Sequence, residues 1–211
     1  MNNDKPGLGA AYALQTPQDS VRLYRDWAET YDRDFADAMD YRYPWTIAAE
    51  FAARARPSDG PVLDIGAGTG LVGAALAEQG DWQIEGLDIS AEMLNVAMAK
   101  GHYRAVHVAD LTQRIDVPLG TYGGLVSAGT FTHGHVGPDA LDQLLLLARR
   151  DALFVLGINA AVYDVLGFGD TFQRLSNNLK DFDLIERPIY GAKTRKGHEN
   201  DTALIAVFRK A

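Results

Sequence analysis

The stretch that most restricts the fold of this chain is residues 62–70, which read VLDIGAGTG. An apolar strand that contains Asp64 runs directly into Gly66, Gly68 and Gly70. Alternating glycines let the backbone turn sharply and approach a ligand closely, and they leave the N–H groups of a following helix free to face it. Asp64, close before the glycines, disfavours a pyrophosphate at this loop. It favours a ligand that carries positive charge, such as an ammonium or a sulfonium.

Two further acids lie where the next strands are expected to end. Residues 83–90 read as a strand that ends near Asp88, and a carboxylate about 20 residues after such glycines can accept hydrogen bonds from both ribose hydroxyls. Residues 106–111 read as a third short strand that ends near Asp110. Asp110 also suits a second role, capping a turn at Thr112. Three acids around a glycine loop indicate a pocket for an adenosine joined to a cationic tail.

Strand and helix patterns alternate along the rest of the chain. We expect further strands over 122–128 and 152–158, and a final pair over 182–190 and 202–208. The expected helices cover 17–31, 45–54, 71–79, 91–100, 138–150 and 162–179. This alternation predicts an α/β fold with a mostly parallel sheet, right-handed crossovers and helices on both faces. The last two strands have β-type composition around a polar loop, so we expect them to form an antiparallel hairpin.

The length of 211 residues is ordinary for one α/β domain. We therefore expect a single domain over residues 1–211. Within it, residues 1–16 are expected as a loose tail, 17–56 as N-terminal helices and 61–211 as a Rossmann-like core.

The glycine motif and the segment Asp88–Leu94 together resemble the class I S-adenosylmethionine-dependent methyltransferases. The resemblance extends roughly from Leu23 to Phe208, and the stretch 127–135 is similar to bacterial relatives of the Williams–Beuren-region methyltransferase-like proteins. It implies a Rossmann-like, seven-stranded fold, S-adenosylmethionine as cofactor and a small-molecule methyl acceptor.

The resemblance also implies roles for individual residues. Those expected to bind the cofactor are Tyr31, Asp64, Gly66, Ala67, Gly68, Gly70, Asp88, Ile89, Met93, Asp110, Leu111 and Ser127. Asp64 and the glycine loop would face the methionine portion of the cofactor. Asp88 would face the ribose, and Asp110 and Leu111 the edge of the adenine. Ile89 and Met93 would form apolar walls for its ring.

The N-terminal helix carries an aromatic stripe, because Tyr24, Trp27 and Tyr31 have i, i+3 and i+7 spacing and share one face. Such a stripe suits packing against the sheet as well as covering a cofactor. Tyr31 is the best candidate to reach the cofactor, since its hydroxyl gives an apolar ring a polar tip.

Two histidines, His133 and His135, follow the fourth expected strand at the ligand-binding edge of the sheet. A neutral histidine suits removal of a proton from a methyl acceptor. We rank His133 first as the proton acceptor and His135 second. A metal is not expected, because two histidines without a nearby carboxylate make a poor ligand set.

Composition excludes several classes of function. The net charge of -8 argues against broad nucleic-acid binding, and the absence of cysteine excludes disulfides and thiolate chemistry. The N-terminus has no apolar signal core, and apolar runs are too short for a membrane span. We expect a cytoplasmic monomer or homodimer without membrane or nucleic-acid partners.

Two alternatives stay open from the sequence. One is a noncatalytic module that binds S-adenosylmethionine. The other is a dinucleotide-dependent oxidoreductase, because residues 68–73 also fit the pattern G-x-G-x-x-G. That match begins two residues late relative to the strand and leaves Asp64 and Gly66 unexplained.

Overall fold

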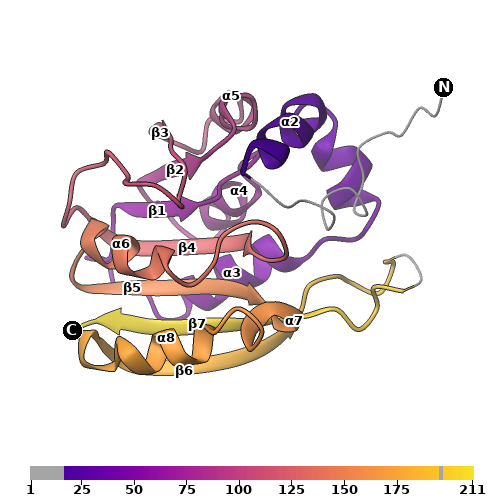
Figure 1. The fold of residues 1–211 in the computed structure, drawn as a ribbon. Coiled ribbons are helices and arrows are strands. Elements are labelled where there is room, and N and C mark those ends of the chain that lie inside the picture. The colour runs from indigo at the N-terminus through magenta and orange to yellow at the C-terminus, as the bar shows by residue number, and fades with distance from the viewer. Residues whose placement is uncertain (1–16, 195–196) are drawn as a thin grey trace.

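The computed structural model describes residues 17–194 and 197–211. The loose tail expected over residues 1–16 lies outside them. Seven strands form one sheet in the order β3-β2-β1-β4-β5-β7-β6 (Figure 1). The strands are β1 (Val62–Ile65), β2 (Ile84–Asp88), β3 (Ala105–Val108), β4 (Tyr122–Phe131), β5 (Ala148–Asn159), β6 (Leu179–Pro188) and β7 (Thr202–Lys210).

Strands β1 to β5 run parallel, and β7 lies antiparallel between β5 and β6. The four residues of β1 are all buried, as expected of a central parallel strand covered on both faces. The predicted mostly parallel sheet with a C-terminal antiparallel hairpin is therefore confirmed.

Helices cover both faces of this sheet (Figure 1). One face carries α3 (Tyr43–Ala52), α4 (Leu71–Ala77) and α5 (Ala91–Ala99), and the other carries α6 (Ala140–Leu147), α7 (Ala160–Tyr163) and α8 (Phe168–Arg174). Each face has its own apolar core: Ile47 and Leu76 belong to the first, Leu144 and Phe168 to the second. The Ser90 side chain caps α5 by accepting from the Met93 N–H at 3.2 Å.

Residues 17–42, hereafter the covering segment, lie beyond the carboxyl ends of the parallel strands (Figure 1). They form α2 (Pro17–Trp27) and a short π-helix, η1 (Asp32–Asp37). The end of the segment is attached to the hairpin, because Tyr41 makes an isolated β-bridge to Tyr190.

Several predicted element bounds are wrong. The first helix ends at Trp27 instead of residue 31, and a π-helix that the sequence did not indicate follows. The helix expected to reach residue 150 ends at Leu147, because β5 already begins at Ala148. The helix expected over 162–179 is broken at Gly167, whose φ of 77° is left-handed.

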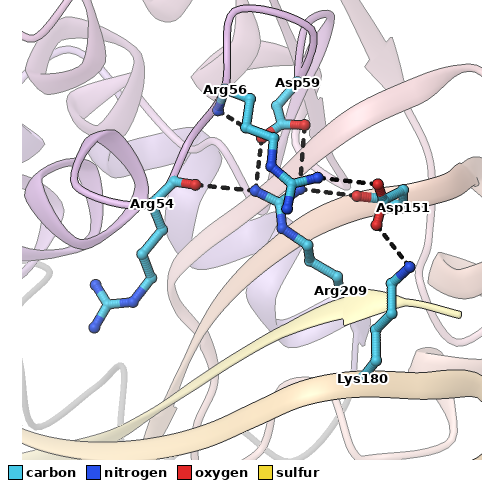
Figure 2. A network of polar contacts seen from close by, with 6 residues as sticks. All are labelled: Arg54, Arg56, Asp59, Asp151, Lys180 and Arg209. Carbon is cyan, nitrogen blue, oxygen red and sulfur yellow. Dashed lines mark hydrogen bonds and ion pairs between the residues drawn. The ribbon is translucent and has the colours of Figure 1, made fainter.

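At the amino ends of the parallel strands, a polar network joins the last strand to the entry of the first (Figure 2). The Arg209 guanidinium donates to both carboxylate oxygens of Asp59, at 3.2 and 2.9 Å, and both side chains are almost fully buried. Arg209 also donates to the backbone carbonyls of Arg54 and Asp151. This network stabilises the end of the sheet that lies opposite the covering segment, at the amino ends of the parallel strands.

Candidate active site

The loop between β1 and α4 turns through three left-handed glycines. Gly66, Gly68 and Gly70 have φ values of 66°, 51° and 87°, a region that strains residues with side chains. A Cβ at Gly66 would lie 2.0 Å from Thr130 Oγ1, so the end of β4 closes tightly against the loop. A Cβ at Gly68 would meet no atom within 4 Å. The backbone at Gly68 therefore faces space that a ligand can enter.

A cavity of about 190 Å³ lies between this loop, the carboxyl ends of the strands and the covering segment. Of the residues singled out in the sequence, it is lined by Tyr31, Gly66, Ala67, Gly68, Asp88, Ile89, Met93, Asp110, Leu111 and His135. Asp64, Gly70, Ser127 and His133 are not part of the lining. Most of the residues expected around the adenosine thus lie on one cavity.

Asp88 lies at the end of β2 and connects two backbone segments. Its carboxylate accepts from the Gly68 N–H and from the Ser90 N–H, each at 2.9 Å. Burial raises the pKa of Asp88, while these backbone N–H groups lower it. An ionised carboxylate has further lone pairs for a ligand hydroxyl. Its position on the cavity suits a ribose.

Asp110 follows β3 and performs the turn role that the sequence left open. Its Oδ1 accepts from the Thr112 backbone N–H at 2.8 Å and from the Thr112 hydroxyl at 2.6 Å. Asp110 and Leu111 nevertheless line the cavity. The turn therefore holds both residues at the cavity wall.

Asp64 is fully buried next to the cavity instead of lining it. Its Oδ2 accepts from the Tyr103 hydroxyl at 2.6 Å, and that hydroxyl accepts from the Gly73 N–H at 3.0 Å. Burial raises the pKa of Asp64 to about 7. Its Oδ1 is buried and has no hydrogen-bond partner within the described part of the chain. A cation nearby would favour the ionised carboxylate.

Two other residues predicted to bind the cofactor lie behind the cavity wall. Gly70 packs against Tyr103 and Ala97 at the start of α4, where a Cβ would lie 2.8 Å from the tyrosine ring. The Ser127 hydroxyl donates to the Ile65 carbonyl at 2.8 Å and so ties β4 to β1. Both residues fix the shape of the loop. A sequence motif alone does not distinguish this structural role from contact with a ligand.

Part of the cavity wall is aromatic. The covering segment supplies Tyr24, Trp27, Tyr31, Phe35 and Tyr41, and α3 and the hairpin supply Tyr43 and Tyr190. The rings touch one another in series; the centroids of Trp27 and Tyr31 and those of Tyr31 and Phe35 are each 5.0 Å apart. The aromatic stripe of the first helix therefore both packs in the core and faces the cavity.

The two histidines lie in different surroundings. His133 is exposed, whereas His135 lines the cavity and stacks on Tyr24 with 5.9 Å between ring centroids. The Tyr24 hydroxyl lies 3.3 Å from His135 Nε2, and Nδ1 is buried without a hydrogen-bond partner among the residues described. Burial lowers the pKa of His135 to about 4, with a smaller contribution from His133. The imidazole is therefore neutral at neutral pH. Of the two histidines, His135 therefore lines the cavity, whereas His133, ranked first from the sequence, does not.

These residues fit S-adenosylmethionine. The cavity has carboxylates at the ends of β2 and β3, apolar side chains between them, and the open backbone of the glycine loop. Asp64 adds a buried carboxylate oxygen without a partner in the described ranges. An adenosine with a cationic tail matches this set of donors and acceptors.

Sequence reasoning missed several residues on the cavity. They include Leu71, Val72, Phe35, Tyr41, Tyr43, Asn159, Ile189 and Tyr190. Most come from segments that are far apart in the chain and meet only in the folded protein. Tyr43 likewise depends on a distant residue: a Cβ at Gly157 would lie 1.9 Å from its hydroxyl, so the glycine at this strand position makes room for the ring.

Comparisons with known proteins agree with this site. Residues 62–150 match the family described as a methyltransferase domain. The chain is 33% identical to human methyltransferase-like protein 27 over 141 residues, which are 64% of this chain and 56% of the relative. It is 40% identical to bovine 18S rRNA (guanine-N(7))-methyltransferase over 73 residues, which are 34% of this chain and 26% of the relative. The chain thus matches about half of the first relative's length and a quarter of the second's.

Among solved structures, a TehB-like S-adenosylmethionine-dependent methyltransferase from Corynebacterium glutamicum has the same fold. The TM-score is 0.60 at 23% identity, over 90% of this chain and 99% of that one. Both the fold and the sequence matches are thus similar to those of S-adenosylmethionine-dependent methyltransferases. These matches favour a methyltransferase over the dinucleotide-dependent oxidoreductase considered from the sequence.

The described residues hold neither a cluster of metal ligands nor a membrane-spanning helix. They contain no group of three or more histidine, aspartate or glutamate side chains arranged to hold a metal ion. Nor does any helix in the described ranges have the length and apolar character needed to cross a membrane.

Proposed function

We propose that this chain transfers a methyl group from S-adenosylmethionine to a small-molecule acceptor. The observation that supports this most directly is the aromatic wall, because the covering segment places Tyr24, Trp27 and Tyr31 over the carboxyl edge of the sheet. Because the covering segment closes over the cavity, an acceptor must be small enough to fit beneath this segment. The covering segment also excludes water from the reacting groups.

The cavity-lining residues divide the work of binding the cofactor. In this proposal Asp88 accepts hydrogen bonds from the ribose, and Ile89 and Met93 contact the adenine faces. Asp110 and Leu111 lie at the adenine edge, while the backbone from Gly66 to Gly68, with Ala67, follows the methionine portion. Asp64, which lies behind the glycine loop, acts through its negative charge. The Tyr31 side chain covers the cavity.

The cofactor supplies a methyl group already activated by the sulfonium. What is left to the protein is positioning, exclusion of water and, for some acceptors, removal of a proton. We assign that last task to His135, because it lines the cavity, its imidazole is neutral and its Nδ1 is buried without a partner among the described residues. His133 is the alternative, reached only from the exposed side of the same loop.

A nucleic-acid acceptor is the second candidate, because a relative of this chain is named as an 18S rRNA methyltransferase. The net charge of -8 disfavours it, since a phosphate backbone requires a basic surface. A noncatalytic S-adenosylmethionine-binding module is the third candidate. Cofactor affinity does not separate a module of that kind from an enzyme, whereas turnover does.

One experiment tests the three candidates together. Release of S-adenosylhomocysteine is measured with pooled small metabolites in one arm and with ribosomal RNA in the other. Mass spectrometry then identifies any product that has gained one methyl group. Methylation of a metabolite supports the proposal. Methylation confined to RNA contradicts the small-molecule acceptor, and cofactor binding without turnover in either arm favours the noncatalytic module.

A further inference from the structure

The side chain of Asp32 joins the covering segment to the cofactor loop. The Thr69 hydroxyl donates to Asp32 Oδ1 at 2.6 Å, and Lys100 Nζ forms an ion pair with Asp32 Oδ2. Thr69 lies between Gly68 and Gly70 in the loop, and Lys100 lies at the end of α5. Asp32 therefore bridges three segments that are far apart in the chain.

The contacts of Asp32 matter for the cavity because Asp32 lies next to a residue that lines it. Asp32 directly follows Tyr31, which lines the cavity and packs between Trp27 and Phe35. Asp32 is also the first residue of the π-helix, a local irregularity that often occurs at functional sites. If the covering segment moves away from the loop, the bonds from Asp32 to Thr69 and Lys100 must break.

Of the two bonds of Asp32, the one to Thr69 has the more buried surroundings. Thr69 is only 2% exposed, so its hydroxyl would be left buried without this partner if Asp32 moved away, which is costly. Lys100 balances the negative charge of Asp32, but the two side chains are 26% and 37% exposed, so this ion pair contributes less.

We propose that Asp32 is a positioning residue that fastens the covering segment to the cofactor loop and thereby sets the rate of cofactor release. It does not touch the acceptor or the reacting atoms. Its effect passes through the hydroxyl of Thr69 and the placement of Tyr31. Opening of the segment, and with it the exchange of S-adenosylmethionine for S-adenosylhomocysteine, requires the carboxylate to leave Thr69 and Lys100.

The test measures dissociation of S-adenosylhomocysteine from the immobilised full-length protein by surface plasmon resonance. Asp32→Ala and Thr69→Val should each raise the dissociation rate about tenfold or more, because each removes the charge-assisted hydrogen bond. Thr69→Ser keeps a hydroxyl and should restore most of the slow rate. Asp37→Ala, an exposed acid of the same π-helix, is the matched control and should dissociate like the wild type.

Two further measurements separate this role from a general loss of structure. The double variant Asp32→Ala/Thr69→Val should dissociate no faster than the faster single variant, because both changes remove the same bond. Hydrogen exchange over residues 31–37 of the ligand-free protein should rise in Asp32→Ala and stay unchanged in Asp37→Ala. Wild-type dissociation rates in both single variants, additive effects in the double variant, or an equal effect of Asp37→Ala would overturn the proposal.

Discussion

Asp88 occupies the position where the cofactor loop and the end of β2 meet, and its carboxylate accepts from the N–H groups of Gly68 and Ser90. Replacing Asp88 with Ala should weaken S-adenosylhomocysteine binding by roughly 1.5–3 kcal/mol, the range for hydrogen bonds to a charged group. Calorimetry measures the loss. Asp116→Ala, an exposed acid outside the cavity lining, should bind normally. A folded Asp88→Ala protein with unchanged affinity would place the ribose partner elsewhere.

His135 and His133 form a natural pair of variants, because they lie in one loop and differ in burial. Once an acceptor is known, His135→Ala should lower turnover about tenfold or more, since a general base contributes at least that much. His133→Ala should lie near the wild type, and both should retain S-adenosylhomocysteine affinity. Normal turnover in both variants would show that the acceptor needs no base.

The pH dependence of turnover gives a second test of His135. Burial lowers its pKa to about 4, so the imidazole loses its ability to accept a proton only as the pH falls through about 4. The rate should therefore stay level where an unperturbed histidine, with a pKa of about 6.5, would already be half protonated. A turnover profile that falls with a midpoint near 6.5, and loses that midpoint in His135→Ala, would contradict the buried neutral base.

Burial shifts the pKa of Asp64 in the opposite direction to that of His135, because it disfavours the charged form of both side chains. The pKa of Asp64 is raised to about 7 in the folded protein and is about 3.9 in an unfolded chain. Between these values the folded state holds the extra proton, so rising pH removes stability from the ligand-free protein. The slope is at most about 1.4 kcal/mol per pH unit. Urea unfolding of the wild type and Asp64→Asn across this window should show the difference in stability between them falling with pH. Parallel curves would contradict the raised pKa.

Residues that form a local pattern could be predicted, whereas those that depend on distant contacts could not. The glycine loop and Asp88 follow from a strand, a turn and a second strand, which are near one another in the sequence. The role of Asp64 behind the loop depends on Tyr103, which lies 39 residues further along the chain. Asp32 likewise meets Thr69 across 37 residues, and no local periodicity encodes that pairing.

The same difference between local patterns and distant contacts applies to the helices and strands. Helix and strand types were predicted along most of the chain, because amphipathic periods and turn residues specify them locally. Their ends were less predictable: β5 begins at Ala148 because pairing with β4 and the bonds from Lys210 to the carbonyls of Leu145 and Ala148 outweigh the helical pattern of that stretch. The π-helix had no local signal at all.

The covering segment is the element whose behaviour should change most with the cofactor. It contacts the loop through Asp32 and the hairpin through the bridge between Tyr41 and Tyr190. Segments that cover a binding site gain protection when a ligand binds beneath them. Hydrogen exchange over residues 17–42 should slow when S-adenosylhomocysteine is added, more than exchange over β1. Equal protection with and without ligand, together with full activity after deletion of residues 1–35, would rule out a covering role.

At the scale of the whole molecule, the candidate site and a buried ion pair that stabilises the fold lie at opposite ends of one sheet. The cavity lies at the carboxyl ends of the parallel strands, whereas the ion pair between Asp59 and Arg209 lies at their amino ends (Figure 2). The pair joins the turn before β1 to β7, and β4 and β5 lie between these two strands in the sheet. Its loss should therefore weaken the fold without reshaping the site.

Asp59→Ala leaves the Arg209 guanidinium buried without its carboxylate, so it should lower the free energy of unfolding by about 3–5 kcal/mol. Asp142→Ala breaks an ion pair with Arg174 in which both side chains are about half exposed, and it should cost about 1 kcal/mol or less. Urea unfolding measures both changes. Calorimetry below the unfolding range should give wild-type affinity for S-adenosylhomocysteine in both variants. If Asp59→Ala is as stable as Asp142→Ala, the buried pair does not hold the sheet edge together; if it folds but loses cofactor affinity, the two ends of the sheet are coupled.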